Sequence, residues 1–154
     1  MSGTSPAGGV QVFRAGAMAD LPALMAFIDA ACDALHADAD ARFAVRLAVE
    51  EVFTNILEHG YAGDGPVAVA VDGGPRCIRI RLSDEAPVFD PADAPAPDMA
   101  APLDERDPGG LGWHLVHQLV DEVEHKPAPG RRRGNVFTLL KQLPAPAPDA
   151  QEAK

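Results

Sequence analysis

Glu51 and Asn55 are two residues of this 154-residue chain whose types and spacing could perform chemistry. They stand four positions apart, and an α-helix places side chains at that separation on one face. Mg²⁺ prefers oxygen ligands, and a single protein oxygen combined with water and phosphate oxygens is a normal arrangement for it. Asn55 could therefore hold a magnesium ion while Glu51 orients or deprotonates a nucleophile. A helix edge that faces water explains the same two residues without any function.

Two further features could bind other parts of one ligand. Asp84 ends a predicted strand, where a carboxylate can accept a hydrogen bond from an exocyclic amine such as adenine N6, although an aspartate there can also form a turn. Gly109-Gly110-Leu111-Gly112 precedes a predicted helix, where glycines let the backbone approach a phosphate and the helix N-terminus favours anions. It matches neither GxGxxG nor the Walker pattern, so taken alone it is explained by a plain turn.

The order and spacing of these three motifs together resemble the GHKL ATPase superfamily. The resemblance rests on Glu51–Tyr61, Asp84–Ala86 and Gly109–Val116, which are similar to the N, G1 and G2 boxes of that superfamily. Within it, the chain most resembles the anti-sigma-factor serine/threonine kinases of the RsbW and SpoIIAB type, especially at Thr54–Tyr61, Asp84–Pro91 and Leu119–Val123. The resemblance covers roughly residues 10 to 143.

The resemblance implies a role for each matching residue. Glu51 would be the general base that activates a serine or threonine hydroxyl of a protein substrate, and Asn55 would hold Mg²⁺ between the phosphates of ATP. Asp84 would read adenine N6, directly and through a water molecule that Thr138 would assist. The remaining nucleotide contacts would come from Ala86, Gly109, Gly110, Leu111 and Gly112. An ATP lid would span residues 92–112.

The implied activity is a protein serine/threonine kinase that takes part in partner switching. Such a protein would use ATP and Mg²⁺ to phosphorylate a STAS-type anti-anti-sigma protein, and it would sequester a sigma factor or an equivalent regulator. Homodimers are common in this branch. Two alternatives stay open. One is a nucleotide-dependent binding module without kinase turnover. The other is an ATPase subunit of a larger machine, which would need a transducer domain, and we expect none after residue 143.

Three positions depart from the family's usual pattern. Ala86 stands where glycine is normal, and it would be strained if the backbone there had a positive φ. Asn135 follows Gly134 where threonine is more usual, and Trp113 replaces a smaller aliphatic residue. These departures motivate the binding-module alternative. Glu51 argues against it, because a pure binder needs no base.

The apolar pattern predicts an α/β (α+β) two-layer sandwich that positions these residues, and the resemblance specifies it as a Bergerat-type fold. We expect a mixed, mostly antiparallel sheet of about four strands packed against three helices. The predicted helices are Met18–Leu35, about Asp40–His59, and Leu111 to about Glu124. The predicted strands are Val10–Arg14, Val67–Val71, Cys77–Leu82 and Val136–Leu140, the middle two forming a hairpin. The domain would occupy residues 10–143, with flexible tails at 1–9 and 144–154.

Composition excludes several other functions. The chain has 13 Lys and Arg against 23 Asp and Glu, a formal net charge of -10, which argues against nucleic acid as a direct partner. We expect no signal peptide, and no apolar run approaches the ~20 residues of a membrane span, so we expect a cytoplasmic protein without a membrane partner. Cys32 and Cys77 should be buried free thiols. His114 and His117 lie three apart, but no further ligand completes a zinc site.

Overall fold

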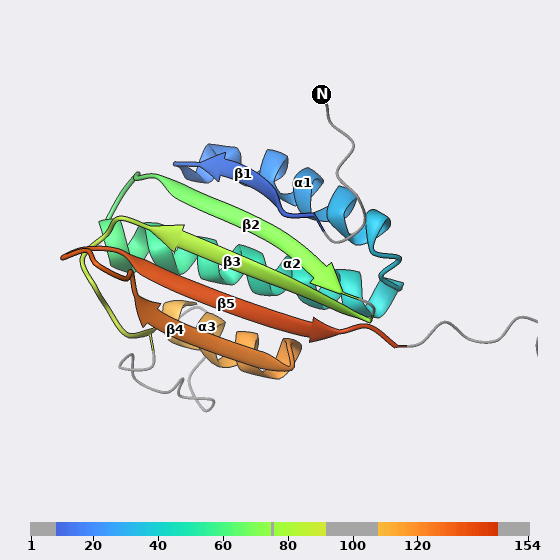
Figure 1. The fold of residues 1–154 in the computed structure, drawn as a ribbon. Coiled ribbons are helices and arrows are strands. Elements are labelled where there is room, and N and C mark those ends of the chain that lie inside the picture. The colour runs from blue at the N-terminus through green and yellow to red at the C-terminus, as the bar shows by residue number, and fades with distance from the viewer. Residues whose placement is uncertain (1–8, 75, 92–107, 145–154) are drawn as a thin grey trace, which may run out of the picture.

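The computed structural model describes residues 9–74, 76–91 and 108–144 and has two layers, a sheet and a set of helices that cover one face of it (Figure 1). The strands are β1 (Gln11–Ala15), β2 (Val67–Gly74), β3 (Cys77–Asp84), β4 (Glu122–Pro127) and β5 (Asn135–Gln142). The helices are α1 (Leu21–Ala34), α2 (Ala39–Asn55) and α3 (Pro108–Leu119), with a short 3₁₀ turn at Met18–Asp20 and a π-helical turn at Ile56–Tyr61. The two-layer architecture predicted from the sequence is thus confirmed.

The strands lie in the order β1-β2-β3-β5-β4, and every pairing between described strands is antiparallel. The sheet therefore has five strands rather than about four, and its described part is antiparallel rather than mixed. Ile80 lies opposite Val71 on one side and Leu139 on the other. Because side chains alternate along a strand, this register places the apolar residues of three strands in one row on the same face.

The helices form where apolar residues recur at helical spacing. In α1, Leu24, Ile28 and Ala31 are buried, and a proline occupies the first turn, where its missing N–H costs nothing. In α2, the side chain of Asp38 caps the N-terminus by accepting a hydrogen bond from the Ala41 amide at 2.8 Å. The apolar stripe of α2 faces the sheet. Glu51, at the edge of this stripe, therefore lies against α3.

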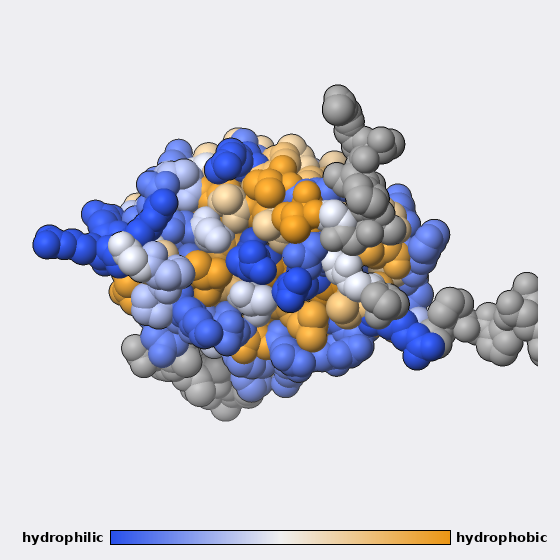
Figure 2. All heavy atoms as spheres, in the orientation of Figure 1, coloured by the Kyte–Doolittle hydropathy of each residue, from blue (hydrophilic) through white to orange (hydrophobic). Residues whose placement is uncertain are grey.

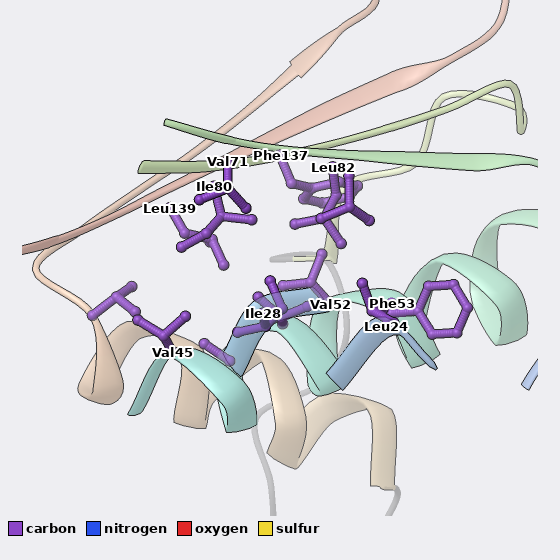
Figure 3. Packing of buried hydrophobic residues seen from close by; sticks show 14 of the residues in the cluster. Leu24, Ile28, Val45, Val52, Phe53, Val71, Ile80, Leu82, Phe137 and Leu139 are labelled. Carbon is purple, nitrogen blue, oxygen red and sulfur yellow. The ribbon is translucent and has the colours of Figure 1, made fainter. Parts of the chain in front are cut away.

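The core lies between the sheet and the helices (Figure 3). Helix α1 contributes Leu24 and Ile28, and α2 contributes Phe53 among others. The largest fully buried side chains are Phe53, Phe137, Leu24, Ile28, Ile56, Ile78, Ile80, Leu82, Leu139, Val45, Val49 and Val52. Burying an apolar side chain of this size contributes roughly 1.5–3 kcal/mol, so this layer holds the site's elements in place.

The predicted extension of the third helix to about Glu124 is wrong. Helix α3 ends at Leu119, and the chain turns back as strand β4, which pairs with β5. The Asp121 amide donates to the Leu140 carbonyl at 2.9 Å, and the Asp121 carboxylate accepts from the Gln142 amide at 2.6 Å. Val123 lies opposite Leu139 in this pairing. The pattern of charged and less polar residues in Glu122–Pro127 is compatible with either a strand or a helix. This segment is a strand because it pairs with the edge of β5.

The end of the second helix and the start of α3 also differ from prediction. The second helix is α-helical only to Asn55, and a π-helical turn, Ile56–Tyr61, replaces its expected last turn. Such turns occur often at functional sites. The segment 109–112, which the sequence taken alone assigned to a turn and the resemblance to the end of the lid, lies inside α3, because Pro108 is suited to the first position of a helix. The rest of the expected lid, residues 92–107, and most of both expected tails lie outside the described residues.

Figure 2 shows the face of the sheet that no helix covers, where hydrophilic and hydrophobic residues are mixed. Arg79 and Arg81 are exposed on this face, whereas Ile78 and Ile80 between them are buried on the other, as the alternation in the sequence predicted. Cys32 is a buried free thiol as expected, but Cys77 is only half-buried. Among the described helices, none combines the length and the apolar character needed to cross a membrane.

Candidate active site

Glu51 lies on α2 against the third glycine of the predicted glycine-rich segment. A Cβ atom added at Gly112 would overlap with the Glu51 carboxylate, so the glycine leaves this carboxylate its present position beside α3. Glu51 is half-buried, and burial raises the pKa of its carboxyl group. The neighbouring charges of Glu50 and Glu58 raise the pKa further. The two helices therefore bring together two of the three motifs found in the sequence.

Asn55 is the last residue of α2, one helical turn from Glu51, and it is only 3% exposed. Its Nδ2 atom is buried and has no hydrogen-bond partner among the described residues. An unpaired buried polar atom costs free energy, on the order of 1–3 kcal/mol, and such atoms are unusual in folded proteins. Asn55 is therefore a buried side chain whose Nδ2 group is free to donate a hydrogen bond to a ligand.

Asp84 ends β3 on the helix-covered face of the sheet and is 5% exposed. Its Oδ1 atom accepts three hydrogen bonds: from the Ala86 amide at 3.0 Å, and from the Asn135 amide and side chain at 3.1 Å and 3.0 Å. Its Oδ2 atom is buried without a partner in the described part of the chain. Burial raises the pKa of Asp84, and the hydrogen bonds from Asn135 and Ala86 oppose that rise.

Asn135 and His125 belong to this site, although neither was predicted as a site residue and Asn135 was noted only as a departure from the family's pattern. Asn135 is fully buried at the start of β5 and bonds to Asp84, and its Oδ1 atom lies 2.8 Å from Nε2 of His125 on β4. A signal was present in the sequence, because Asn135 occupies a position that alternation with Phe137 and Leu139 assigns to the buried face. A polar residue at such a position needs buried partners.

Thr138 was predicted to assist an adenine-binding water molecule, and the structure overturns this. Thr138 alternates with the buried Phe137 and Leu139, and it lies opposite Arg81 in the register. It therefore points to the uncovered face of the sheet, away from Asp84. The resemblance selected the right strand but placed the contact three residues too far along it, since Asn135 is the residue that bonds to Asp84.

Ala86 and Trp113, two of the departures from the family pattern, are accommodated without strain. Ala86 is not among the described non-glycine residues with positive φ, so the expected cost of replacing glycine is absent. Its methyl group lies where a Cβ at Gly60 would approach within 3.0 Å, so the glycine leaves room for it. Trp113 is 9% exposed and packs edge-on against Phe137, with ring centroids 5.9 Å apart.

Gly134 packs closely against the backbone of Asp84. We expect Gly134→Ala to destabilise the protein by about 2–4 kcal/mol. Its φ of 114° disfavours any other residue, and an added Cβ would come within 2.8 Å of the Asp84 carbonyl oxygen and 2.9 Å of the Ala128 Cβ. Gly130→Ala is the matched control, because φ is 71° there but nothing lies within 4 Å of the added atom. Its cost should be about 1–2 kcal/mol. Urea unfolding measures both, and equal losses would contradict a steric role for Gly134.

The two unpaired buried atoms, Asn55 Nδ2 and Asp84 Oδ2, fit a ligand that supplies polar groups at two places. The N-terminal part of α3, which favours anions, follows both motifs in the chain and lies against Glu51 in space. No cluster of three or more His, Cys, Asp or Glu side chains that could hold a metal ion occurs in the described ranges.

This fold and site define the class of protein: residues 15–141 match the family described as the histidine kinase-like ATPase domain, and the chain belongs to that family. The GHKL-type resemblance found in the sequence is thereby confirmed. The chain is also similar to three proteins named as kinases. It is 29% identical to the serine/threonine-protein kinase BtrW of Bordetella bronchiseptica over 101 residues, which are 64% of this chain and 68% of BtrW.

The other two relatives are serine-protein kinases named RsbW. The chain is 34% identical over 88 residues to that of Bacillus pumilus, covering 52% of this chain and 54% of the relative. It is 29% identical over 86 residues to that of Halalkalibacterium halodurans, covering 53% of each. The matched stretch thus spans about half the length of these two RsbW proteins.

Proposed function

We propose that this protein is a serine/threonine protein kinase that transfers the γ-phosphoryl group of ATP, with Mg²⁺, to a hydroxyl group of another protein. The observation that carries the proposal is the half-buried Glu51 carboxylate, held one helical turn from the buried Asn55 and against the N-terminal part of α3. A protein that only binds nucleotide has no use for a basic carboxylate at this place. The names of the similar proteins agree with such an activity.

The residues divide the work between binding and catalysis. Asp84 would accept a hydrogen bond from the adenine amine through its free Oδ2 atom, and the side-chain carbonyl oxygen of Asn55 would hold Mg²⁺. Backbone N–H groups of 109–112, at the start of α3, would bind phosphate oxygens. Glu51 would take the proton from the acceptor hydroxyl as this oxygen attacks the γ-phosphorus and the bond to the bridging oxygen breaks, which releases ADP. ATP would supply the phosphoryl group, and Mg²⁺ would neutralise its negative charge.

The partners we propose come from the resemblance to the RsbW and SpoIIAB branch. The phosphoryl acceptor would be a STAS-type anti-anti-sigma protein, and the sequestered partner would be a sigma factor or an equivalent regulator. We propose one domain within residues 10–143 and a homodimeric assembly. A nucleotide-dependent binding module without turnover remains the competing function, since it would use the same Asp84 and Asn55.

The proposal is tested by incubating the purified protein with γ-labelled ATP, Mg²⁺ and the STAS-like protein that it captures from its own cells. We expect label on a serine or threonine of the captured protein, and no transfer after EDTA removes the metal. If ATP binds and no label moves, the binding module is the better account. If ATP does not bind, both functions fail.

Replacing Glu50 or Glu58 by glutamine should move the acid limb of the transfer rate to lower pH. A general base acts in its ionised form, so the rate falls as the pH falls through the raised pKa of Glu51. Removing a neighbouring negative charge favours ionised Glu51 and lowers that pKa. Single-turnover rates across the acid range measure the shift. A limb that stays in place, or moves to higher pH, would show that Glu51 is not the titrating base.

A further inference from the structure

The side-chain amide of Asn135 uses all of its hydrogen-bonding capacity inside the protein. Its Nδ2 group donates to Asp84 Oδ1 at 3.0 Å and to the Pro87 carbonyl at 3.2 Å. Its Oδ1 atom accepts from the Phe89 amide at 3.2 Å and lies 2.8 Å from His125 Nε2. Two acceptors lie on one side and a backbone donor on the other, so only one orientation of the amide satisfies its surroundings.

His125 must therefore carry a hydrogen on Nε2. The Oδ1 atom of Asn135 can only accept, and at 2.8 Å an unprotonated nitrogen would face it lone pair to lone pair. The ring is held by aromatic neighbours, with its centroid 4.7 Å from that of Phe137 and 6.1 Å from that of Phe89. His125 is thus positioned to hold the amide of Asn135 in its single orientation from a strand outside the predicted motifs.

This network decides what Asp84 offers to a ligand. Three N–H donors saturate Oδ1, while Oδ2 stays free and buried. The free atom accepts a hydrogen bond as long as Asp84 is ionised. Burial raises the pKa of Asp84, and without the donors from Asn135 only the Ala86 amide and the nearby His125 would oppose that rise. A protonated carboxyl group could donate instead of accept, which would suit a purine with oxygen in place of the amine.

We propose that His125 and Asn135 are positioning residues that make the nucleotide site select a purine with an exocyclic amine over a 6-oxo purine. Neither needs to touch the nucleotide; both act by keeping Asp84 an obligatory acceptor. The inference rests on the proposed nucleotide-binding function and adds the origin of its base selectivity. It assigns a function to a half-buried histidine that no predicted motif includes.

The test compares the binding of ATP and ITP, which differ in the 6-amino and 6-oxo groups, to the full chain. His125→Phe keeps an aromatic ring beside Phe137 but removes the N–H donor. We expect the ratio of the ITP to the ATP dissociation constant to fall about fivefold, as for the loss of one buried hydrogen bond. His125→Gln supplies an amide donor and should restore most of the ratio. His114→Phe, at an exposed position on α3 whose contact is Gln118, makes the same chemical change elsewhere and should leave the ratio unchanged.

The outcomes separate this inference from the proposed function. If wild type prefers ATP and His125→Phe keeps the wild-type ratio while remaining folded, the inference is wrong and the nucleotide-binding function stands. If wild type binds neither nucleotide, both are overturned. A merely structural role for His125 would weaken both nucleotides equally. Independently, ¹⁵N NMR of the nucleotide-free protein should show hydrogen on Nε2 of His125, and a neutral ring with hydrogen only on Nδ1 would also refute the inference.

Discussion

Replacing Glu51 by glutamine is expected to lower the rate of phosphoryl transfer about a hundredfold or more, the range expected for the loss of a general base. Glutamine is nearly the same size and fits beside Gly112, where the carboxylate now lies. It cannot accept a proton from the acceptor hydroxyl. ATP affinity should change little, because the proposed nucleotide contacts come from Asp84 and Asn55. Single-turnover transfer and equilibrium ATP binding, measured on the same preparation, test both statements.

Glu50→Gln is the comparison that identifies the base, since Glu50 is the adjacent carboxylate on the same helix. Above the pH range in which Glu51 titrates, it should keep most of the wild-type rate. Equal losses in the two variants would mean that the negative charge of this helix matters rather than a particular base. A Glu51→Gln variant that transfers the phosphoryl group at the wild-type rate would show that Glu51 is not the general base.

The second large effect is expected for Asp84→Asn, which should weaken ATP binding about a hundredfold, from one lost charge-assisted hydrogen bond and one repulsive contact. The three donors now bonded to Oδ1 will hold the amide oxygen of the new residue at that place. The amide nitrogen must then take the position of Oδ2. It presents a donor to the adenine amine, which is also a donor, and a suitable partner to the oxygen of a 6-oxo purine.

Binding of ITP should therefore improve relative to ATP in Asp84→Asn, and calorimetry with both nucleotides measures this directly. Asp72→Asn, on β2 and paired with Arg79 at 2.9 Å on the uncovered face of the sheet, is the matched control and should leave both affinities unchanged. Loss of affinity for both nucleotides to the same extent would mean that Asp84 supports the fold and does not read the base.

The order of the motifs was sufficient to predict the family. Glu51 and Asn55 share a helix face because they are four apart, a relation that local geometry imposes. The alternation of residues in β3 likewise predicted that this strand buries one face, and Asp84 ends it there. These predictions succeeded because each depends on only one helix or strand.

Predictions failed where two elements competed for the same residues. Glu122–Pro127 has a pattern compatible with either a helix or a strand, and pairing with the edge of β5 made it a strand. The last turn of the second helix widened into a π-helical turn, in which Gly60 leaves space for Ala86 and Phe89. Local propensity is a weak preference that contacts of this kind override.

The sequence by itself determined the fold class, the histidine kinase-like ATPase family and the positions of Glu51, Asn55 and Asp84. Only the tertiary structure decided which oxygen of Asp84 is free, because the donors to the other oxygen come from Ala86 and Asn135, far apart in the chain. It also decided that Asn135, and not Thr138, faces this carboxylate. Pairing of β5 with β3 and β4 brings Asn135 between Asp84 and His125, and a hydrogen bond requires that proximity, which residue types and spacing do not encode.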